Sequence, residues 1–175
     1  MIRPPRPDEL PLLPQIENEA DRSYARVGLS FIVDMPPATL ASLEQGRRRD
    51  RLWIATSSSG RPVGFALMKL HGDTAWLDQL SVLERWRRSG LGTALIERTA
   101  AHALRLGFEA LYLSTYRDVP WNAPYYARRG FTEVARASWP RAVRQQMQRE
   151  NSHGHPAWRR IVMRRAVAAS SPSLP

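Results

Sequence analysis

The stretch Leu80–Thr93, which reads LSVLERWRRSGLGT, decides the fold. Its pattern predicts the end of a strand, a short basic turn and then a helix that opens on Gly90 and Gly92. Glycine has no Cβ, so the backbone of such a loop can approach a ligand closely and adopt a positive φ. The first amides of a helix have no intrahelical partner, and the helix dipole adds positive charge there. The stretch therefore predicts an anion site, most naturally for a phosphate or pyrophosphate.

The glycine spacing distinguishes this loop from two better-known phosphate loops. A P-loop has Lys-Ser/Thr directly after its second glycine, and the only lysine of this chain is Lys69. A dinucleotide fingerprint has a third glycine three residues after the second, where this chain has Leu95. Glu109 lies roughly where a ribose-binding acid is expected. The P-loop is excluded, and a dinucleotide-binding enzyme stays open as an alternative.

Length and composition favour one globular domain. The chain has 175 residues and no cysteine, which excludes disulfides, thiolate zinc sites and a cysteine-bound acyl intermediate. No apolar run approaches the ~20 residues that span a bilayer, and the N-terminal residues lack the apolar segment of a signal peptide. We expect a single domain over residues 1–167, a disordered tail over 168–175, a cytoplasmic location and no membrane association.

The formal net charge of +10 raises the question of nucleic-acid binding. All basic residues except Lys69 are arginines, and they are scattered in short groups without a sustained run. Scattered arginine is typical of a solvated surface, so we expect no nucleic-acid partner, although a nucleic-acid binder remains a rival hypothesis. A locally positive entrance would equally suit a polyanionic small molecule.

The N-terminal third predicts an edge strand, two helices and a meander. Residues 2–6 read as a short edge strand, and Asp8 as the N-cap of a helix to about Ala25. The helical spacing joins Leu12, Leu13, Ile16, Ala20 and Tyr24. Residues 38–45 predict a second helix that ends at Gly46, and three antiparallel strands are expected over 52–56, 63–70 and 75–82.

The helix after the glycine loop has a clear apolar stripe. Its core face is predicted from Gly92, Leu95, Ile96, Thr99, Ala100 and Ala103. His102 falls outside that stripe and is expected to be exposed. The next strand is predicted over 110–115, and a strand, helix and strand of this length form a right-handed βαβ unit. This strand is therefore expected to pair parallel to the strand over 75–82.

A second motif lies at Trp121–Phe131. Asn122 can cap a short helix that carries Tyr125 and Tyr126 and is closed by Gly130. A strand over 132–135, an exposed helix over 141–150 and a last strand over 161–163 are expected to follow. His153 and His155 share a loop with no other ligand type beside them, so no metal site is predicted.

Together these motifs resemble the Gcn5-related N-acetyltransferase (GNAT) superfamily. The strand end Leu80-Ser81-Val82, the loop Arg87-x-x-Gly90-x-Gly92, and Tyr126 four residues before Gly130-Phe131 carry the resemblance. Glu84 departs from the proline that many members have there. The resemblance implies an α/β fold with a central mixed, mostly antiparallel twisted sheet of about six to seven strands. It also implies a parallel pair splayed at the cofactor site, with helices on both faces.

The resemblance also implies acetyl-CoA as co-substrate, with no metal. The pantetheine arm would lie against the strand end and the pyrophosphate against the loop amides. Tyr126 would donate a proton to the departing coenzyme A thiolate, because a neutral phenol can act as a general acid. The cofactor-binding residues it implies are Leu80, Ser81, Val82, Arg87, Arg88, Ser89, Gly90, Leu91, Gly92, Thr93, Asn122 and Tyr126.

An acceptor ammonium must lose a proton before its nitrogen attacks a thioester. Asp78 lies on the strand that leads into the loop, where aspartate is disfavoured, and we expect it to be the base, directly or through water. The resemblance places the first helix and the loop after it beside the acceptor. Glu17, Tyr24 and Phe31 are therefore the substrate-pocket candidates.

The predicted activity is acetyl transfer from acetyl-CoA to a primary amine. Because the chain has no cysteine, direct attack in a ternary complex is favoured over an acetyl-cysteine intermediate. A small amine or amino acid-like acceptor is the first expectation and a protein amine the second, and the protein is expected to be a monomer or homodimer. A regulatory domain that binds acetyl-CoA without catalysis is the alternative.

Overall fold

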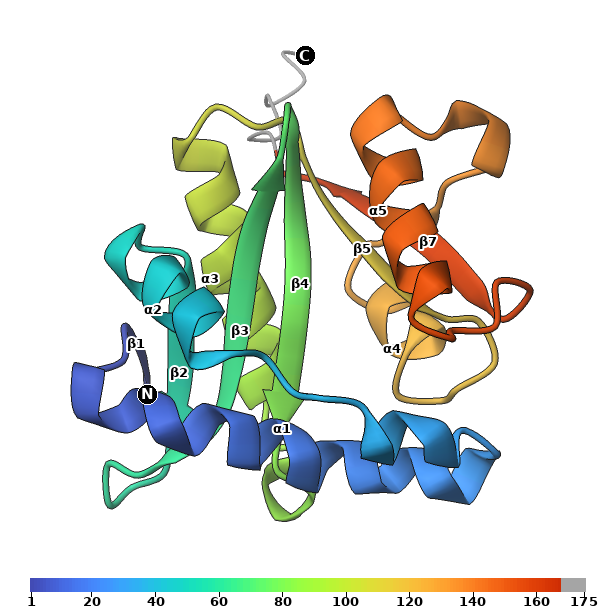
Figure 1. Cartoon of the computed structure of the whole chain (residues 1–175). Helices are drawn as coiled ribbons and strands as arrows, with labels where there is room; N and C mark the ends of the chain where they lie inside the picture. The colour runs from blue at the N-terminus through green and yellow to red at the C-terminus, as the bar shows by residue number, and fades with distance from the viewer. Residues whose placement is uncertain (168–175) are drawn as a thin grey trace. The chain divides into compact units, whose positions relative to one another are not determined.

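The computed structural model describes residues 1–167, so the expected tail over 168–175 lies outside the described residues (Figure 1). Seven strands of the described chain form one mixed sheet in the order β1-β2-β3-β4-β5-β7-β6. The strands are β1 (Ile2–Arg3), β2 (Leu52–Thr56), β3 (Pro62–His71), β4 (Thr74–Val82), β5 (Ala110–Tyr116), β6 (Thr132–Glu133) and β7 (Arg160–Ala166). The helices are α1 (Leu13–Asp21), α2 (Leu40–Arg48), α3 (Leu91–Arg105), α4 (Ala123–Ala127) and α5 (Arg141–Ser152). None of the helices in residues 1–167 has the length and apolar character that a membrane crossing needs.

The predicted α/β architecture is confirmed. β2 pairs antiparallel with β1 and β3, and β7 pairs antiparallel with β5 and β6. β4 and β5 form the parallel pair that the βαβ pattern predicts, and their ladder joins Ala75 to Leu111 and Trp76 to Tyr112. The described chain divides into two compact units, and each is described by itself below. Unit 1 comprises Met1–Lys69 and Leu77–Thr99, and unit 2 comprises Leu70–Trp76 and the described residues from Ala100 onward.

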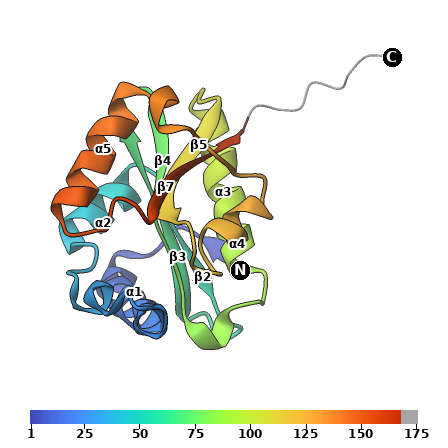
Figure 2. The same cartoon turned by 90° about the vertical axis from the view of Figure 1, so that its right-hand side faces the viewer.

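In unit 1, helices cover both faces of the strands. Figures 1 and 2 show α1 and α2 on one face of β2 and β3, and α3 on the other. All five residues of β2 are buried, as expected for a strand covered on both sides. The α3 stripe is also confirmed, because Leu95, Ile96 and Thr99 are fully buried.

The first helix differs from its prediction. An α-helix forms only over Leu13–Asp21, between the 3₁₀ helices η1 (Pro7–Leu12) and η2 (Arg22–Val27). Pro11 in η1 and Pro14 at the start of α1 lack amide donors, which disfavours one continuous α-helix from Asp8. The N-cap of η1 is Arg6, so the prediction of Asp8 as cap is wrong. Leu12 is 40% exposed, whereas Leu13, Ile16 and Ala20 are buried as the spacing predicts.

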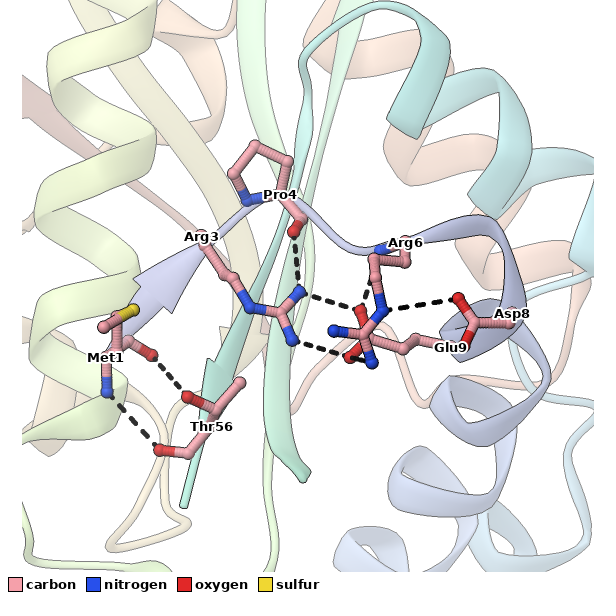
Figure 3. Close-up of polar contacts among 7 residues, drawn as sticks. All are labelled: Met1, Arg3, Pro4, Arg6, Asp8, Glu9 and Thr56. Carbon is pink, nitrogen blue, oxygen red and sulfur yellow. Dashed lines mark hydrogen bonds and ion pairs between the residues drawn. The ribbon is translucent and has the colours of Figure 1, made fainter. Parts of the chain in front are cut away.

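A buried ionic cluster anchors the N-terminal segment (Figure 3). Glu9 is 3% exposed, and its carboxylate accepts two hydrogen bonds from the Arg3 guanidinium at 2.6 and 2.8 Å. It also accepts the Arg6 amide at 2.7 Å and pairs with the Arg6 side chain at 2.9 Å. A buried carboxylate needs such partners, since leaving it unpaired would cost several kcal/mol, of order 3–5. Asp8, the acid that the sequence suggests as the N-cap, forms an ion pair with the exposed Arg6, in which Oδ1 lies 3.4 Å from Nε.

Two glycines allow close packing onto β3. A Cβ at Gly46 would lie 2.5 Å from Leu67 Cδ1, which explains the glycine at this position. Helix α2 continues through Gly46 to Arg48, so the predicted helix end at Gly46 is wrong. Thr39 caps the helix by accepting the Ser42 amide. A Cβ at Gly64 would lie 2.7 Å from the carbonyl oxygen of Ser81. Gly64 therefore permits β3 to run close against the end of β4, which leads into the glycine loop.

Unit 2 has its own apolar core. Figures 1 and 2 show α5 and α4 on opposite faces of β5 and β7. The α5 face carries a cluster made of Trp76, Trp139, Val143, Met147 and Val162. The helix predicted as exposed over 141–150 is thus amphipathic, because Val143 and Met147 lie four residues apart on one buried face.

His102 corrects another prediction in this unit. It was expected to be exposed, yet it is only 9% exposed. Its Nδ1 lies 2.9 Å from the Arg105 Nη2 one turn later, and packing around the end of α3 covers the ring. The apolar stripe is therefore wider than the residue types suggest, since a histidine ring can complete it when its nitrogen has a partner.

Candidate functional site

The glycine loop of unit 1 has the backbone that the sequence predicts. β4 ends at Val82, the short 3₁₀ helix η4 spans Glu84–Trp86, and α3 begins at Leu91. Gly90 has φ +82°, and a Cβ added there would meet no atom within 4 Å. This residue is therefore exposed backbone in a conformation that favours glycine, directly before the first amides of a 15-residue helix. The geometry fits an anion that approaches the backbone closely.

Arg87 is directed into the protein. Its Nη2 donates to the carbonyl oxygen of Ala20 at 2.9 Å and to Ser23 Oγ at 3.2 Å, and its Nε donates to the carbonyl oxygen of Val82 at 3.4 Å. The side chain thus joins the end of β4 to the last turn of α1. These hydrogen bonds of the Arg87 side chain hold the glycine loop against α1.

The other loop residues lie at the surface or at the helix start. Arg88 and Ser89 are exposed, and Arg88 has φ +62°, unusual for a residue with a side chain. Ser89 Oγ donates to the carbonyl oxygen of Trp86 at 2.5 Å. Leu91, Gly92 and Thr93 form the first turn of α3, and Leu80 and Val82 are half-buried at the end of β4. Ser81 is buried, and its Oγ accepts a hydrogen bond from Gln79 at 3.0 Å.

Glu17, a predicted pocket residue, has an unusual electrostatic environment. Its Oε2 accepts the Ala38 amide at 3.0 Å. Burial is the main cause that raises the pKa of this carboxyl to about 7; the negative charges of Asp21 and Asp78 act in the same direction, and the Ala38 hydrogen bond and Lys69 oppose the shift. A carboxyl that titrates near neutral pH can both take up and release a proton under ordinary conditions.

Asp21 lies one helical turn after Glu17 on α1 and was not predicted. Burial raises the pKa of its carboxyl to about 6, although the charge of Arg87 acts in the opposite direction. Within residues 1–167 its carboxylate makes no hydrogen bond or ion pair. Asp21 could have been predicted from the sequence, because it lies four residues after the candidate Glu17 on a predicted helix and therefore on the same face.

Asp78, the predicted base, lies on β4 in an ion pair. Its Oδ2 is 2.8 Å from Lys69 Nζ on the neighbouring strand β3, and its side chain is 19% exposed. The role of the chain's only lysine as the partner of Asp78 could not be read from the sequence, because 8 residues of hairpin separate the two. Tyr24 and Phe31, the other two pocket candidates, are half-buried in η2 and in the 3₁₀ helix η3 (Ser30–Asp34).

Unit 2 carries the second predicted motif. Tyr126 is half-buried on α4, with its ring edge-on to Tyr125 and to Phe131, at centroid distances of 5.4 and 5.7 Å. Gly130 has φ +80° and Phe131 is buried, as expected for a residue pair that closes the helix. Asn122 occupies the N-cap position and is buried, but its side chain makes no capping hydrogen bond. The predicted capping role of Asn122 is therefore wrong.

A buried polar network in unit 2 was missed. Glu150 on α5 accepts Ser114 Oγ at 2.7 Å and pairs with Arg160 at 2.6 Å. Burial alone would raise the pKa of Glu150, but the charge of Arg160 and hydrogen bonds from Ser114, Arg160 and Gln146 hold it below its usual value. Nothing in the local sequence links these residues, since they come from β5, α5 and β7.

The two histidines of the last loop have protein partners. His155 Nδ1 lies 2.7 Å from the Tyr116 hydroxyl, and burial lowers the pKa of His155 to about 4. His153 Nδ1 lies 2.6 Å from the carbonyl oxygen of Arg149. Across residues 1–167, no group of three or more His, Cys, Asp or Glu side chains is arranged to hold a metal ion.

Comparison with known proteins identifies one family. The model of the acetyltransferase (GNAT) family matches residues 14–131, which include the glycine loop, Glu17, Asp78 and Tyr126. Among solved structures, an acetyltransferase of the GNAT family from Staphylococcus aureus Mu50 aligns with a TM-score of 0.71 at 15% identity, over 96% of this chain and 99% of that chain.

Two further structures share the fold. The PaiA N-acetyltransferase from Thermoplasma acidophilum, solved in complex with coenzyme A, aligns with a TM-score of 0.67 at 15% identity, over 95% of this chain and 98% of that chain. The ribosomal protein S18 alanine N-acetyltransferase from Escherichia coli aligns with a TM-score of 0.62 at 21% identity, over 100% of this chain and 98% of that chain. At these identities the likeness concerns the fold.

Proposed function

The chain belongs to the acetyltransferase (GNAT) family, and from this premise we propose that it transfers the acetyl group of acetyl-CoA to a primary amine by direct attack in a ternary complex. The observation that carries the proposal is the loop from Arg87 to Gly92, with its exposed positive-φ Gly90 at the start of α3. The acceptor is a small amine or amino acid-like molecule in the first place and a protein amine in the second.

The loop supplies the donor-binding groups. The amides from Gly90 to Thr93 hold the pyrophosphate, assisted by the dipole of α3 and by exposed Arg88 and Ser89. The backbone of Leu80–Val82 pairs with the amide-bearing pantetheine arm as an added strand would. Asn122 of unit 2 is buried and does not cap α4, and we propose that it binds the cofactor.

The reaction needs one proton removed and one supplied. The acceptor nitrogen attacks the thioester carbonyl carbon, the C–N bond forms, and the C–S bond breaks as sulfur leaves with the electron pair. The ammonium proton passes to a carboxylate of unit 1 or to water, and Asp78 is the strand residue expected for that role. Tyr126 gives a proton to the thiolate, because its phenol is neutral at pH 7.

The donor proposal is tested by thermal unfolding with acetyl-CoA and, as a control ligand, NADH. A ligand at 100 times its Kd adds about 2.7 kcal/mol of stability. Gly90→Ala should weaken acetyl-CoA binding at least tenfold, because the added Cβ would lie where the pyrophosphate approaches the backbone and because a positive φ is disfavoured for alanine. Gly60→Ala is the matched control: Gly60 also has φ +82° and open space at its Cβ, so both variants lose about 1–2 kcal/mol of stability.

Three outcomes discriminate between the functions. Stabilisation by acetyl-CoA, reduced only in Gly90→Ala, supports the proposal. Stabilisation by NADH alone supports a dinucleotide-binding enzyme. Stabilisation by acetyl-CoA without thiol release for any amine supports a regulatory domain.

The role of Tyr126 has its own test. Tyr126→Phe removes one hydroxyl and keeps the ring that packs on Phe131. The expected result is a fall in kcat of about 100-fold with little change in acetyl-CoA affinity, since general acid catalysis contributes about 10²–10⁴. Tyr125→Phe, on the same helix, is the control. An equal effect of the two substitutions would contradict the assignment.

A further inference from the structure

Helix α1 presents two carboxyl groups on one face, and within residues 1–167 neither of them forms an ion pair with a side chain. Glu17 and Asp21 are four residues apart, so they lie one turn from each other on the same side of the helix. Glu17 uses one oxygen, Oε2, to accept the Ala38 amide. Within the described residues, its Oε1 and both oxygens of Asp21 make no hydrogen bond or ion pair. Oxygens of a partly buried carboxylate that are not used by the protein can accept hydrogen bonds from a cationic ligand, and such charge-assisted bonds are among the stronger ones.

The surrounding charges do not neutralise this pair. The charged groups that act on Glu17 are Asp21, Asp78 and Lys69, and Arg87 acts on Asp21. Lys69 is paired with Asp78 at 2.8 Å. Arg87 directs its Nη2 to Ala20 and Ser23, and its charge acts on Asp21 against the rise of the pKa of that carboxyl. The neighbourhood therefore keeps an excess of negative charge, even though the chain as a whole carries +10.

This carboxyl pair lies next to the strand that is proposed to hold the acyl donor. Asp78, which is close enough to influence Glu17, is two residues before Leu80 on β4. Arg87 of the glycine loop bonds to Ala20, the residue directly before Asp21. Figure 1 shows α1 crossing the sheet at the end of β4, where the loop begins. The two carboxyl groups are thus on the acceptor side of the donor strand within unit 1.

We propose that Glu17 takes the proton from the acceptor's ammonium, that Asp21 binds the acceptor's positive charge, and that the acceptor is accordingly an amine without a carboxylate beside its amino group. This inference rests on the proposed acetyl transfer and names the acceptor class for it. It also replaces the amino acid-like acceptor, and it moves the proton-accepting role from Asp78 to Glu17.

Glu17 suits proton transfer better than Asp78 on geometry. An acceptor ammonium at Asp78 would compete with the Lys69 ammonium for Oδ2, whereas Oε1 of Glu17 is open to a donor. In the reaction the N–H bond breaks, its electron pair stays on nitrogen for attack, and the proton ends on Oε1. Burial, which raises the pKa of Glu17 to about 7, makes its carboxylate a stronger base and supports this role.

The acceptor class follows from Coulomb's law. An α-amino acid brings its own carboxylate to within a few ångströms of its nitrogen, hence close to Glu17 and Asp21. Like charges at such separations repel strongly in a partly desolvated site. An amine that lacks the carboxylate meets only attraction. The pocket should therefore discriminate between two molecules that differ in this one group.

The test compares amines with the amino acids from which they formally derive. The pairs are 2-phenylethylamine with phenylalanine, and tyramine with tyrosine, and the reaction is followed by thiol release from acetyl-CoA. We expect kcat/KM to be at least 100-fold higher for the amine of at least one pair. Asp21→Asn should lower that ratio about tenfold by admitting the amino acid. The amines are more basic than the amino acids, so a smaller fraction of each amine is unprotonated at a given pH. This difference works against the expected preference for amines and cannot be its cause.

The proton-accepting role is tested by the pH profile of the same reaction. The wild-type kcat/KM for the preferred amine should rise through a limb near pH 7. Glu17→Gln, which keeps an acceptor for the Ala38 amide, should remove this limb and lower kcat about 100-fold. Asp78→Asn should keep the limb. Glu19→Gln is the matched control, because Glu19 is exposed on the same helix.

The failures are separable. Equal use of amines and amino acids, loss of the limb in Asp78→Asn in place of Glu17→Gln, or no transfer to any amine while acetyl-CoA still stabilises the protein would each overturn the inference and leave donor binding intact. Absence of stabilisation by acetyl-CoA in the wild type would overturn the proposed function itself.

Discussion

Glu17 in unit 1 and Glu150 in unit 2 are both glutamates removed from full contact with water, and their surroundings differ in one respect. Glu150 has Arg160, Ser114 and Gln146 around its carboxylate, which hold its pKa low. Glu17 has one backbone amide and two neighbouring acids, and its pKa rises to about 7. The same side chain is held in its ionised form in one unit and has its pKa near neutral pH in the other.

The contrast separates a structural carboxylate from a functional one. A buried carboxylate that is completed by protein groups stabilises the ionised form and resists change of charge. A buried carboxyl group without such partners is costly to ionise. Native proteins keep such a group where a ligand or a reaction depends on it. The number of hydrogen-bonding and charged partners, more than burial, therefore distinguishes Glu150 from Glu17.

The largest expected effect is on stability, from Glu150→Ala. The substitution leaves the Arg160 guanidinium, 11% exposed, without its carboxylate. We expect a loss of about 3–5 kcal/mol in the free energy of unfolding, measured by denaturant titration at pH 7. Glu133→Ala serves as the control, since Glu133 forms an exposed pair with Arg117 and should cost at most about 1 kcal/mol. Equal losses would remove the basis of the comparison.

A smaller effect of opposite sign is expected from Glu17→Gln. An acid whose folded-state pKa lies above its unfolded value of 4.5 holds its proton more tightly when folded. As pH rises from about 4.5 to 7 the unfolded chain loses the proton first, so stability falls across that window. Replacing Glu17 by the neutral amide should remove this loss.

Glu17→Gln should accordingly be more stable than the wild type by about 1–2 kcal/mol at pH 8, less than the full pKa difference would give because the carboxylate reaches solvent. The advantage should disappear near pH 4. Thermal unfolding of both proteins across this pH range measures it, with Glu19→Gln as reference. A pH-independent difference would show that packing, and not ionisation, separates the two proteins.

The smallest effect is expected at Glu44, an exposed carboxylate on α2. Hydrogen bonds from Arg47 and Arg48 lower the pKa of Glu44 to about 2. Solvent screens such pairs, so Glu44→Gln should leave the thermal midpoint unchanged within error. A clear loss of stability would mean that exposed pairs count as much as the network of Glu150, and the comparison would need revision.

Local features of this protein were predictable because they depend on nearby residues. The antiparallel strands over 52–56, 63–70 and 75–82, the α3 stripe and the glycine loop all follow from periodicity and turn residues. The parallel pairing of β4 with β5 followed from the length of the crossover between them.

Errors arose where a distant residue changed the outcome. The sequence predicts a helix end at Gly46, but Gly46 lies inside α2, at a position where Leu67 on β3 leaves no room for a Cβ. His102 reads as a surface residue but is covered at the end of α3. Asp8 reads as a cap, whereas the buried acid of that segment is Glu9, whose partner Arg3 lies on β1. In each case burial or packing in the folded chain, which the local residue types do not show, decided the outcome.

The sequence by itself determined the fold class, the loop that suits a phosphate and the family, since these depend on residue types at fixed spacing. Only the tertiary structure decided which acidic side chains have partners for their carboxylates and which do not. Asp78 meets Lys69 across a hairpin, Glu150 meets Arg160 across a helix and a strand, and Asp21 meets no partner among residues 1–167. The pKa of a carboxyl depends on distance and dielectric in space, and neither quantity is encoded in the local order of residues.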